Sequence, residues 1–170
     1  MLTVGLYPNL FKKNLIKVTE SLISWFEDRG YLVLLPKDVA KSLCMPHLST
    51  DVNDLVRKID VAITLGGDGT LLSVARQTAP HKVPILGINM GHVGFLTEVE
   101  LSDLYTDLEY FNRKDYSIDV RMMLEAEVVR GKRVLKNFLA LNDVVITKGP
   151  FSRLIRLKTY ANEAYVATYP

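Results

Sequence analysis

Residues 66–70, with the sequence GGDGT, are the segment of this chain best suited to chemistry. They place three glycines around one carboxylate, directly after the short apolar run 61–65. Glycine reaches positive φ readily and has no side chain, so the backbone N–H groups of such a turn can approach an anionic ligand closely. Asp68 could act there as a base or hold a metal-bound phosphate. A plain strand-to-helix turn is the alternative, but the paired glycines and the helical pattern that follows favour ligand binding.

A second glycine-rich segment, residues 89–95, follows the apolar run 84–88. Its glycines could merely relieve crowding at a helix entry. In a parallel sheet, however, ligands bind beyond the carboxyl ends of the strands, and both glycine segments follow predicted strands. We therefore expect the two segments to meet at one edge of the sheet, with Asn89 among the binding residues.

The elements that must position these segments alternate between strand and helix patterns. Short apolar runs predict buried strands, and apolar residues at helical spacing predict amphipathic helices between them. The predicted strands are 2–7, 31–35, 61–65 and 84–88, and the predicted helices are 15–26, 52–58, 71–76 and 101–111. This alternation is typical of an α/β fold with a doubly wound parallel sheet. Segment 37–50 is ambiguous and partly loop.

The pattern changes in the last third of the chain. Strand-turn-strand patterns at 124–141 and 155–169 predict an antiparallel meander. We accordingly divide the chain into an α/β domain, 1–113, and part of an antiparallel all-β domain, 114–170. So small a sheet buries little apolar surface and leaves strand edges unpaired. Further chain or another subunit should cover it, which makes a homo-oligomer plausible.

A polar pair, Asn142 and Asp143, interrupts the apolar stretch 138–146. Polar side chains are costly to bury without partners. An amide beside a carboxylate matches the neighbouring hydroxyls of a ribose, although a capped hairpin turn is the alternative. Arg153, just beyond, could balance a phosphate or remain a solvated surface residue.

Composition excludes several classes of function. The 170 residues are 48% apolar and 24% charged, with a net charge of +2, which is too small to indicate nucleic-acid binding. The single Cys44 excludes a disulfide framework and a structural zinc site, and favours a reducing compartment. With no signal peptide and no apolar stretch of about 20 residues, we expect a cytoplasmic protein without a membrane partner. The three histidines lack the spacing of metal ligands.

The two common phosphate fingerprints are missing. No Lys-Ser/Thr of a Walker A loop follows residue 70, and no Gly-x-Gly-x-x-Gly opens a dinucleotide-binding unit. An ordinary hydride-transfer enzyme is therefore not expected.

Three segments together resemble the NAD kinase family in order and approximate spacing: GGDGT at 66–70, GINMGHVGFL at 87–96 and LNDVVI at 141–146. The first alone is shared with diacylglycerol kinases, sphingosine kinases and phosphofructokinases. The resemblance implies transfer of the ATP γ-phosphoryl group to the 2′-hydroxyl of the adenosine ribose of NAD, giving NADP. A divalent ion, usually Mg²⁺, would arrive with the ATP.

The resemblance also implies roles for individual residues. Asp68 would accept or orient the proton of the 2′-hydroxyl, and the glycines beside it would admit the phosphates. Phe95 would lie near the adenine. The implied nucleotide-binding residues are Gly67, Asp68, Gly69, Thr70, Asn89, Phe95, Asn142, Asp143 and Arg153.

One departure from the family pattern concerns the end of the chain. Similar enzymes continue with a Gly-Asp-Gly turn and a Thr-Gly-Ser-Thr-Ala-Tyr segment that completes the dinucleotide site. We therefore expect residues 1–170 to be the N-terminal portion of such an enzyme, with little or no kinase activity alone. A lipid kinase of the diacylglycerol type and a non-catalytic nucleotide-binding module are the alternatives.

Overall fold

The computed structural model describes residues 1–10, 15–91, 94–148 and 155–170. Six strands form one parallel sheet with the order β3-β2-β1-β4-β5-β6. Their bounds are β1 Thr3–Pro8, β2 Leu32–Pro36, β3 Ser49–Thr50, β4 Val61–Gly66, β5 Ile85–Asn89 and β6 Val99–Glu100. The predicted α/β class with a doubly wound parallel sheet is confirmed.

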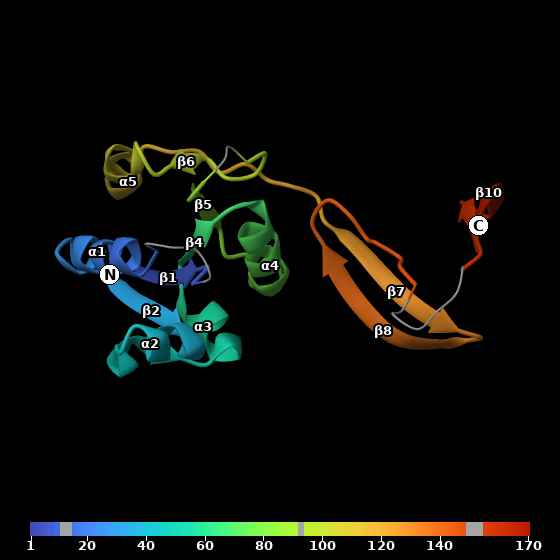
Figure 1. Cartoon of the computed structure of the whole chain (residues 1–170), viewed down its shortest axis with the longest axis horizontal. Coiled ribbons are helices and arrows are strands. Elements are labelled where there is room, and N and C mark those ends of the chain that lie inside the picture. The colour runs from blue at the N-terminus through green and yellow to red at the C-terminus, as the bar shows by residue number, and fades with distance from the viewer. Residues whose placement is uncertain (11–14, 92–93, 149–154) are drawn as a thin grey trace.

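Helices cover both faces of this sheet. They are α1 Leu15–Glu27, α2 Lys37–Ser42, α3 Val52–Lys58, α4 Asp68–Thr78 and α5 Leu104–Arg113, with short 3-10 helices η1 Pro46–Leu48 and η2 Ala79–His81. Figure 1 shows α1 and α5 on one side of the sheet and α4 on the other. The ambiguous segment 37–50 thus contains α2, η1 and β3.

Two apolar clusters fill these layers. The larger packs α1, α2 and α5 against the sheet, and its residues include the fully buried Phe26, Leu22 and Leu108. The smaller packs α3 and α4 against the opposite face through Leu55 and Val74. The sheet is therefore buried on both sides, as the continuous apolar runs predicted.

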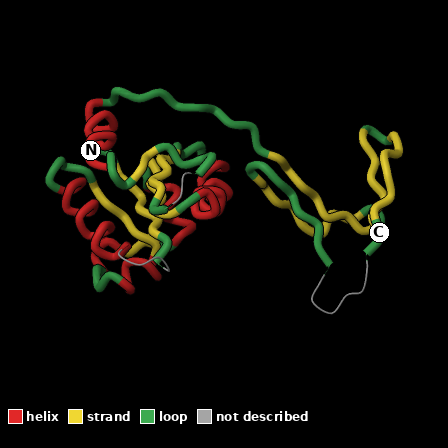
Figure 2. The backbone as a smooth tube through the Cα atoms, turned by 45° about the horizontal axis from the view of Figure 1, so that its top comes forward, coloured by secondary structure: helices red, strands yellow, loops and turns green. Residues whose placement is uncertain are grey.

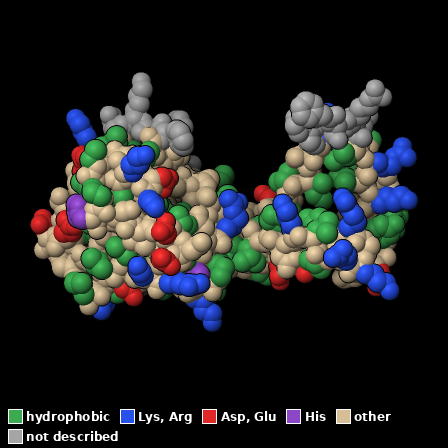
Figure 3. Space-filling view, turned by 90° about the horizontal axis from the view of Figure 1, so that it is seen from below, with side chains coloured by type: hydrophobic (Ala, Val, Ile, Leu, Met, Phe, Trp, Pro, Cys, Tyr) green, Lys and Arg blue, Asp and Glu red, His purple; other side chains and the backbone are tan. Residues whose placement is uncertain are grey.

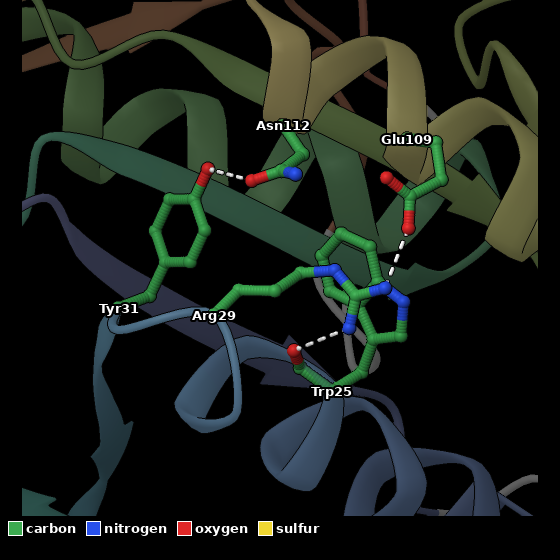
Figure 4. Close-up of polar contacts among 5 residues, drawn as sticks. All are labelled: Trp25, Arg29, Tyr31, Glu109 and Asn112. Atoms are coloured by element: carbon green, nitrogen blue, oxygen red, sulfur yellow. Dashed lines mark hydrogen bonds and ion pairs between the residues drawn. The ribbon is translucent and has the colours of Figure 1, made fainter.

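A polar and aromatic cluster joins α5 to the end of α1 (Figure 4). The Arg29 guanidinium lies 4.0 Å from the Trp25 ring centroid and 2.5 Å from Glu109 Oε1. The Tyr31 hydroxyl donates a hydrogen bond to Asn112 Oδ1 at 3.1 Å. Helix α5 starts later than predicted, since 101–103 form a turn before it.

The remaining strands form two hairpins: β7 Leu124–Arg130 with β8 Arg133–Ala140, and β9 Leu157–Ala161 with β10 Ala164–Tyr169. Each hairpin is a separate two-stranded sheet, so the expected continuous meander does not form among the described residues. Alternation fixes which residues form strands but not which strands pair.

Figure 2 shows both hairpins set apart from the parallel sheet and joined to it by an extended segment. Their apolar side chains are largely open to solvent: Phe138, Tyr160 and Tyr165 are each at least half exposed. In Figure 3 apolar side chains lie between Lys and Arg side chains on this part of the molecule.

Candidate functional site

The glycine turn lies at the carboxyl edge of the sheet, where the strand order reverses. Strand β1 is followed by β2 on one side, and the chain later crosses to β4 on the other side. The ends of the two strands are tied together, because the Asn9 backbone N–H donates to the Leu65 carbonyl at 2.9 Å. Such a reversal is the usual ligand-binding position of an open α/β sheet.

The second glycine segment meets the first at this edge, as the sequence predicted. Gly66, the last residue of β4, pairs with Asn89, the last residue of β5. The Met90 backbone N–H donates to the Gly66 carbonyl at 2.7 Å. Asn89 is 3% exposed, and its Oδ1 accepts a hydrogen bond from the Gly91 N–H at 3.0 Å.

The turn leads into α4 without a side-chain cap. Gly67 is the N-cap residue in an extended conformation, and its carbonyl accepts the Thr70 N–H at 2.9 Å. Gly66 packs so closely on Thr70 that a Cβ atom at position 66 would collide with the Thr70 hydroxyl. Around Gly69, by contrast, a Cβ would meet no protein atom among the described residues. The start of α4 therefore has one packed glycine and one glycine facing open space.

The Asp68 carboxylate binds the backbone of the 94–97 loop. Its Oδ2 accepts the Phe95 N–H at 2.8 Å, and its Oδ1 accepts the Leu96 N–H at 3.1 Å. The pKa of Asp68 is lowered from its ordinary value, first by the Phe95 backbone hydrogen bond, with smaller contributions from the Leu96 backbone and from Thr97; partial burial opposes the shift. Asp68 is therefore ionised at neutral pH.

Gly94 and Gly87 lie where the Asp68 carboxylate and the 94–97 loop pack too closely for a side chain. A Cβ at position 94 would collide with Asp68 Oδ1 and lie 2.7 Å from Thr97 Oγ1. A Cβ at position 87 would lie 2.7 Å from Leu71 Cδ1 and 3.2 Å from the Thr97 Cα. Sequence reasoning missed Gly94, Leu96 and Thr97 as parts of the site. Gly94 lay inside the second glycine segment, but nothing local indicated its contact with Asp68.

The Phe95 side chain projects from this loop into solvent. It is 96% exposed, although its backbone N–H is bound by Asp68. An exposed aromatic ring on an anchored backbone can stack on a planar ligand at little cost in ordering.

No hydrogen bond or ion pair between described residues joins the second polar pair to the glycine turn, although β8 contacts α4 and Leu141 lines the same cavity as Leu71 and Leu96. Asn142 and Asp143 follow β8 and are exposed, with Asn142 in a left-handed conformation at φ 77°. The Asp143 N–H donates to the Leu141 carbonyl at 3.3 Å. They form a polar turn at the end of a strand. Arg153 lies outside the described residues.

A largely apolar cavity of about 700 Å³ adjoins the site. Leu71 of α4, Gly87 of β5 and Leu96 of the 94–97 loop line it, and Tyr116 and Ile118 line it from the segment that leads to the hairpins. Asp68 is not among the residues that line it.

Comparison with known proteins agrees with these segments. A family model described as the ATP-NAD kinase N-terminal domain matches residues 4–116. The chain is 46% identical over 169 residues to an NAD kinase of Caldanaerobacter subterraneus subsp. tengcongensis, covering 99% of this chain and 60% of that protein. It is 42% identical over 170 residues to an NAD kinase of Moorella thermoacetica, covering 100% of this chain and 54% of that protein.

A solved structure has the same fold. The yeast NADH kinase complexed with NADH superposes with a TM-score of 0.84 at 19% identity, covering 99% of this chain and 55% of that one. This chain thus spans just over half the length of the solved structure and about 60% of the Caldanaerobacter relative.

Proposed function

The chain belongs to the ATP-NAD kinase family, and from this we propose that the protein transfers the γ-phosphoryl group of ATP to the 2′-hydroxyl of the adenosine ribose of NAD, giving NADP. The observation that carries the proposal is the position of Asp68, an ionised carboxylate at the start of α4 and at the strand reversal.

Asp68 would orient the attacking hydroxyl. A carboxylate has about four lone-pair sites, and the Phe95 and Leu96 hydrogen bonds use one on each oxygen, with Thr97 also close to the carboxylate. A ribose hydroxyl could donate to a remaining site. Because the pKa of Asp68 is lowered, the group is a weak base, so its contribution is orientation and charge more than early proton removal. Phosphoryl transfer depends mainly on such positioning and charge stabilisation.

The start of α4 would receive phosphate oxygens. Gly67 has no side chain at the N-cap position, and Gly69 faces open space. The backbone N–H groups at a helix start and the helix dipole favour an anion there. The Thr70 side chain, which packs against Gly66, would supply a hydroxyl as a further hydrogen-bond donor to the phosphate oxygens.

The dinucleotide would extend from this turn. Phe95 would stack on the adenine, and Asn89 would line the edge between β4 and β5. Asn142, Asp143 and Arg153 would complete the site by binding ribose hydroxyls and a phosphate. Leu141, next to the Asn142–Asp143 pair, lines the same cavity as Leu71 and Leu96, which supports that role.

A divalent ion, Mg²⁺ in our proposal, would be carried by the ATP phosphates. Among the described residues no group of three or more His, Cys, Asp and Glu side chains could hold a metal ion. Asp68 is the carboxylate at the glycine turn, and both its oxygens already accept backbone hydrogen bonds. The phosphate oxygens would therefore supply most of the ligands.

The remaining proposals concern the localisation, the domain division and the oligomeric state of the protein. No helix in the described part of the chain is long and apolar enough to cross a membrane. We propose a cytoplasmic protein, a division into domains 1–113 and 114–170, and a homo-oligomer whose contacts cover the exposed hairpins. Sedimentation at several protein concentrations tests the last point.

The experiment is a chimera. In the Caldanaerobacter relative, the aligned part is replaced by this chain, and NADP formation from ATP and NAD is measured by an NADP-specific coupled assay. We expect activity in the chimera, loss of at least about 100-fold in Asp68→Asn, and little or none in residues 1–170 alone. Unchanged activity in Asp68→Asn would contradict the assigned role.

The same preparations separate the alternatives. Calorimetry with NAD, ATP and NADP measures the binding of each nucleotide. Binding in the absence of turnover would favour a non-catalytic nucleotide-binding module. Phosphorylation of diacylglycerol in vesicles, with none of NAD, would favour a lipid kinase.

A further inference from the structure

We propose that the Asp68 carboxylate is also a clamp that holds the 94–97 loop against the glycine turn, and that Gly94 is a positioning residue that keeps the space for this carboxylate. The inference deepens the proposed function and rests on it for its kinetic part only. The clamp itself is a property of the folded chain and is testable without substrate.

The geometry of the carboxylate carries the first step. Each oxygen accepts one backbone N–H from consecutive residues, Phe95 at 2.8 Å and Leu96 at 3.1 Å. Hydrogen bonds from backbone N–H groups to a charged acceptor are stronger than neutral ones. The loop has no regular secondary structure of its own. These bonds, together with a smaller contribution from Thr97, tie the loop to the first residue of α4.

Gly94 supplies the second step. A methyl group at position 94 would overlap Asp68 Oδ1 and come within 2.9 Å of Asp68 Cγ. The carboxylate is fixed at its other end because Asp68 begins α4. Both sides of the contact therefore resist movement, and a side chain at position 94 must push the loop away from Asp68.

The consequence concerns Phe95. Its ring is 96% exposed, so no packing of the ring holds it in place, and its backbone N–H is one of the two clamped groups. The clamp thus sets where the ring stands relative to the glycine turn. In a kinase for a dinucleotide, it would couple the position of the adenine platform to that of the carboxylate that faces the ribose.

Amide hydrogen exchange tests the clamp directly. Surface amides without hydrogen bonds exchange rapidly, yet we expect the Phe95 and Leu96 amides of the ¹⁵N-labelled protein to be protected at least about tenfold. Asp68→Asn has nearly the same shape but offers one acceptor oxygen and places an NH₂ group opposite the other N–H. It should remove the protection of one or both amides. Gly69→Ala, whose methyl group meets open space, should leave both protected.

A double-mutant cycle tests Gly94. We expect Gly94→Ala to abolish the protection of both amides and to lower the melting temperature. In an Asp68→Ala background the same substitution should cost much less, because the colliding carboxylate is gone. If Gly94→Ala lowers the stability equally in both backgrounds, Gly94 does not have the proposed role. If Gly94→Ala does not fold, the exchange data on the isosteric Asp68→Asn variant decide the clamp on their own.

In the active chimera, Gly94→Ala should raise the KM for NAD by about 10- to 100-fold while the KM for ATP changes less, because the misplaced group is the adenine platform. Equal effects on both substrates would contradict a positioning role. Unprotected Phe95 and Leu96 amides in the wild-type protein would exclude the clamp whatever the activity. Protected amides without NADP formation would instead reject the proposed function and leave the clamp standing.

Discussion

Phe95 donates its backbone N–H to Asp68 Oδ2 at 2.8 Å across 27 positions of the sequence. This bond joins the turn after β4 to the loop after β5, so the two glycine segments form one unit. The side chain that the sequence singles out for chemistry is also a structural acceptor. Substitutions at Asp68 will therefore change stability as well as activity, and the two effects have to be measured separately.

The pH dependence of stability should report the Asp68 contact. Its pKa in the folded chain lies below the ordinary value of 3.8, so the contact contributes stability above that pH and loses it as the pH falls toward the folded pKa. We expect Asp68→Asn to melt at a lower temperature than wild type at pH 7, with the difference shrinking below about pH 4. Melting curves by circular dichroism from pH 7 to pH 3 check this. Asp28→Asn, at an exposed aspartate outside the site, is the matched control.

The packed glycine of the turn should tolerate no side chain. In Gly66→Ala the new methyl group would collide with the Thr70 hydroxyl and come within 2.8 Å of its Cβ. Overpacking of this kind costs about 1–3 kcal/mol. Urea unfolding should show that loss, whereas Gly69→Ala should be neutral or slightly stabilising. Equal losses in both variants would mean that the turn is not packed as described.

The larger apolar cluster depends on Phe26. This side chain is fully buried and makes edge-on contacts with the Trp25, Tyr31 and Phe111 rings. Phe26→Ala should cost about 3–5 kcal/mol, because it leaves a cavity between α1, α5 and the sheet. Phe95→Ala is the matched control for stability, since that ring is 96% exposed. It should unfold at the same urea concentration as wild type.

Removing the Tyr7 hydroxyl should stabilise the protein. Tyr7 is 7% exposed, and its hydroxyl has no hydrogen-bond partner among the described residues. Tyr7→Phe removes an unsatisfied group and should gain up to about 1 kcal/mol in urea unfolding. A loss of stability would indicate a partner for this hydroxyl.

Tyr7 should also make the stability of the fold depend on pH in alkaline solution. Burial raises the pKa of Tyr7 from 10.0 to about 12. A raised pKa means that the neutral phenol is favoured in the folded state, so this stability is present below pH 10 and lost as the pH rises toward 12. The melting temperature of Tyr7→Phe should fall less than that of wild type between those pH values.

The ion pair between Arg29, just after α1, and Glu109 of α5 should weaken in acid. The Arg29 hydrogen bond is the main cause of the lowered pKa of Glu109, whose ordinary value is 4.5. The pair therefore stabilises the fold above that pH and ceases to do so as Glu109 becomes protonated. Glu109→Gln should lose less stability than wild type between pH 7 and pH 3. Glu27→Gln, an exposed carboxylate on α1, is the control, and high salt should reduce the effect.

The sequence determined the elements and the chemical character of the site. Apolar periodicity located the four longer strands of the parallel sheet and most of its helices to within a few residues, because each buried position must be apolar whatever its partner. It missed the two-residue edge strands β3 and β6 and the helix α2, which are too short to show a period. Gly30, just after α1, has φ +78°, which glycine adopts readily, and its N–H donates to the Glu27 carbonyl. The glycines around Asp68 likewise marked a turn at a strand end.

Only the tertiary structure decided which of these elements meet. The contact of Asp68 with Phe95 and Leu96, and that of Arg29 with Glu109, join residues far apart in the chain. Periodicity records whether a residue is buried but not which partner lies against it. The same limit explains the two separate hairpins and the exposed Asn142–Asp143 turn. Strand pairing and contacts between distant residues depend on packing across the whole fold. The local sequence pattern does not specify that packing.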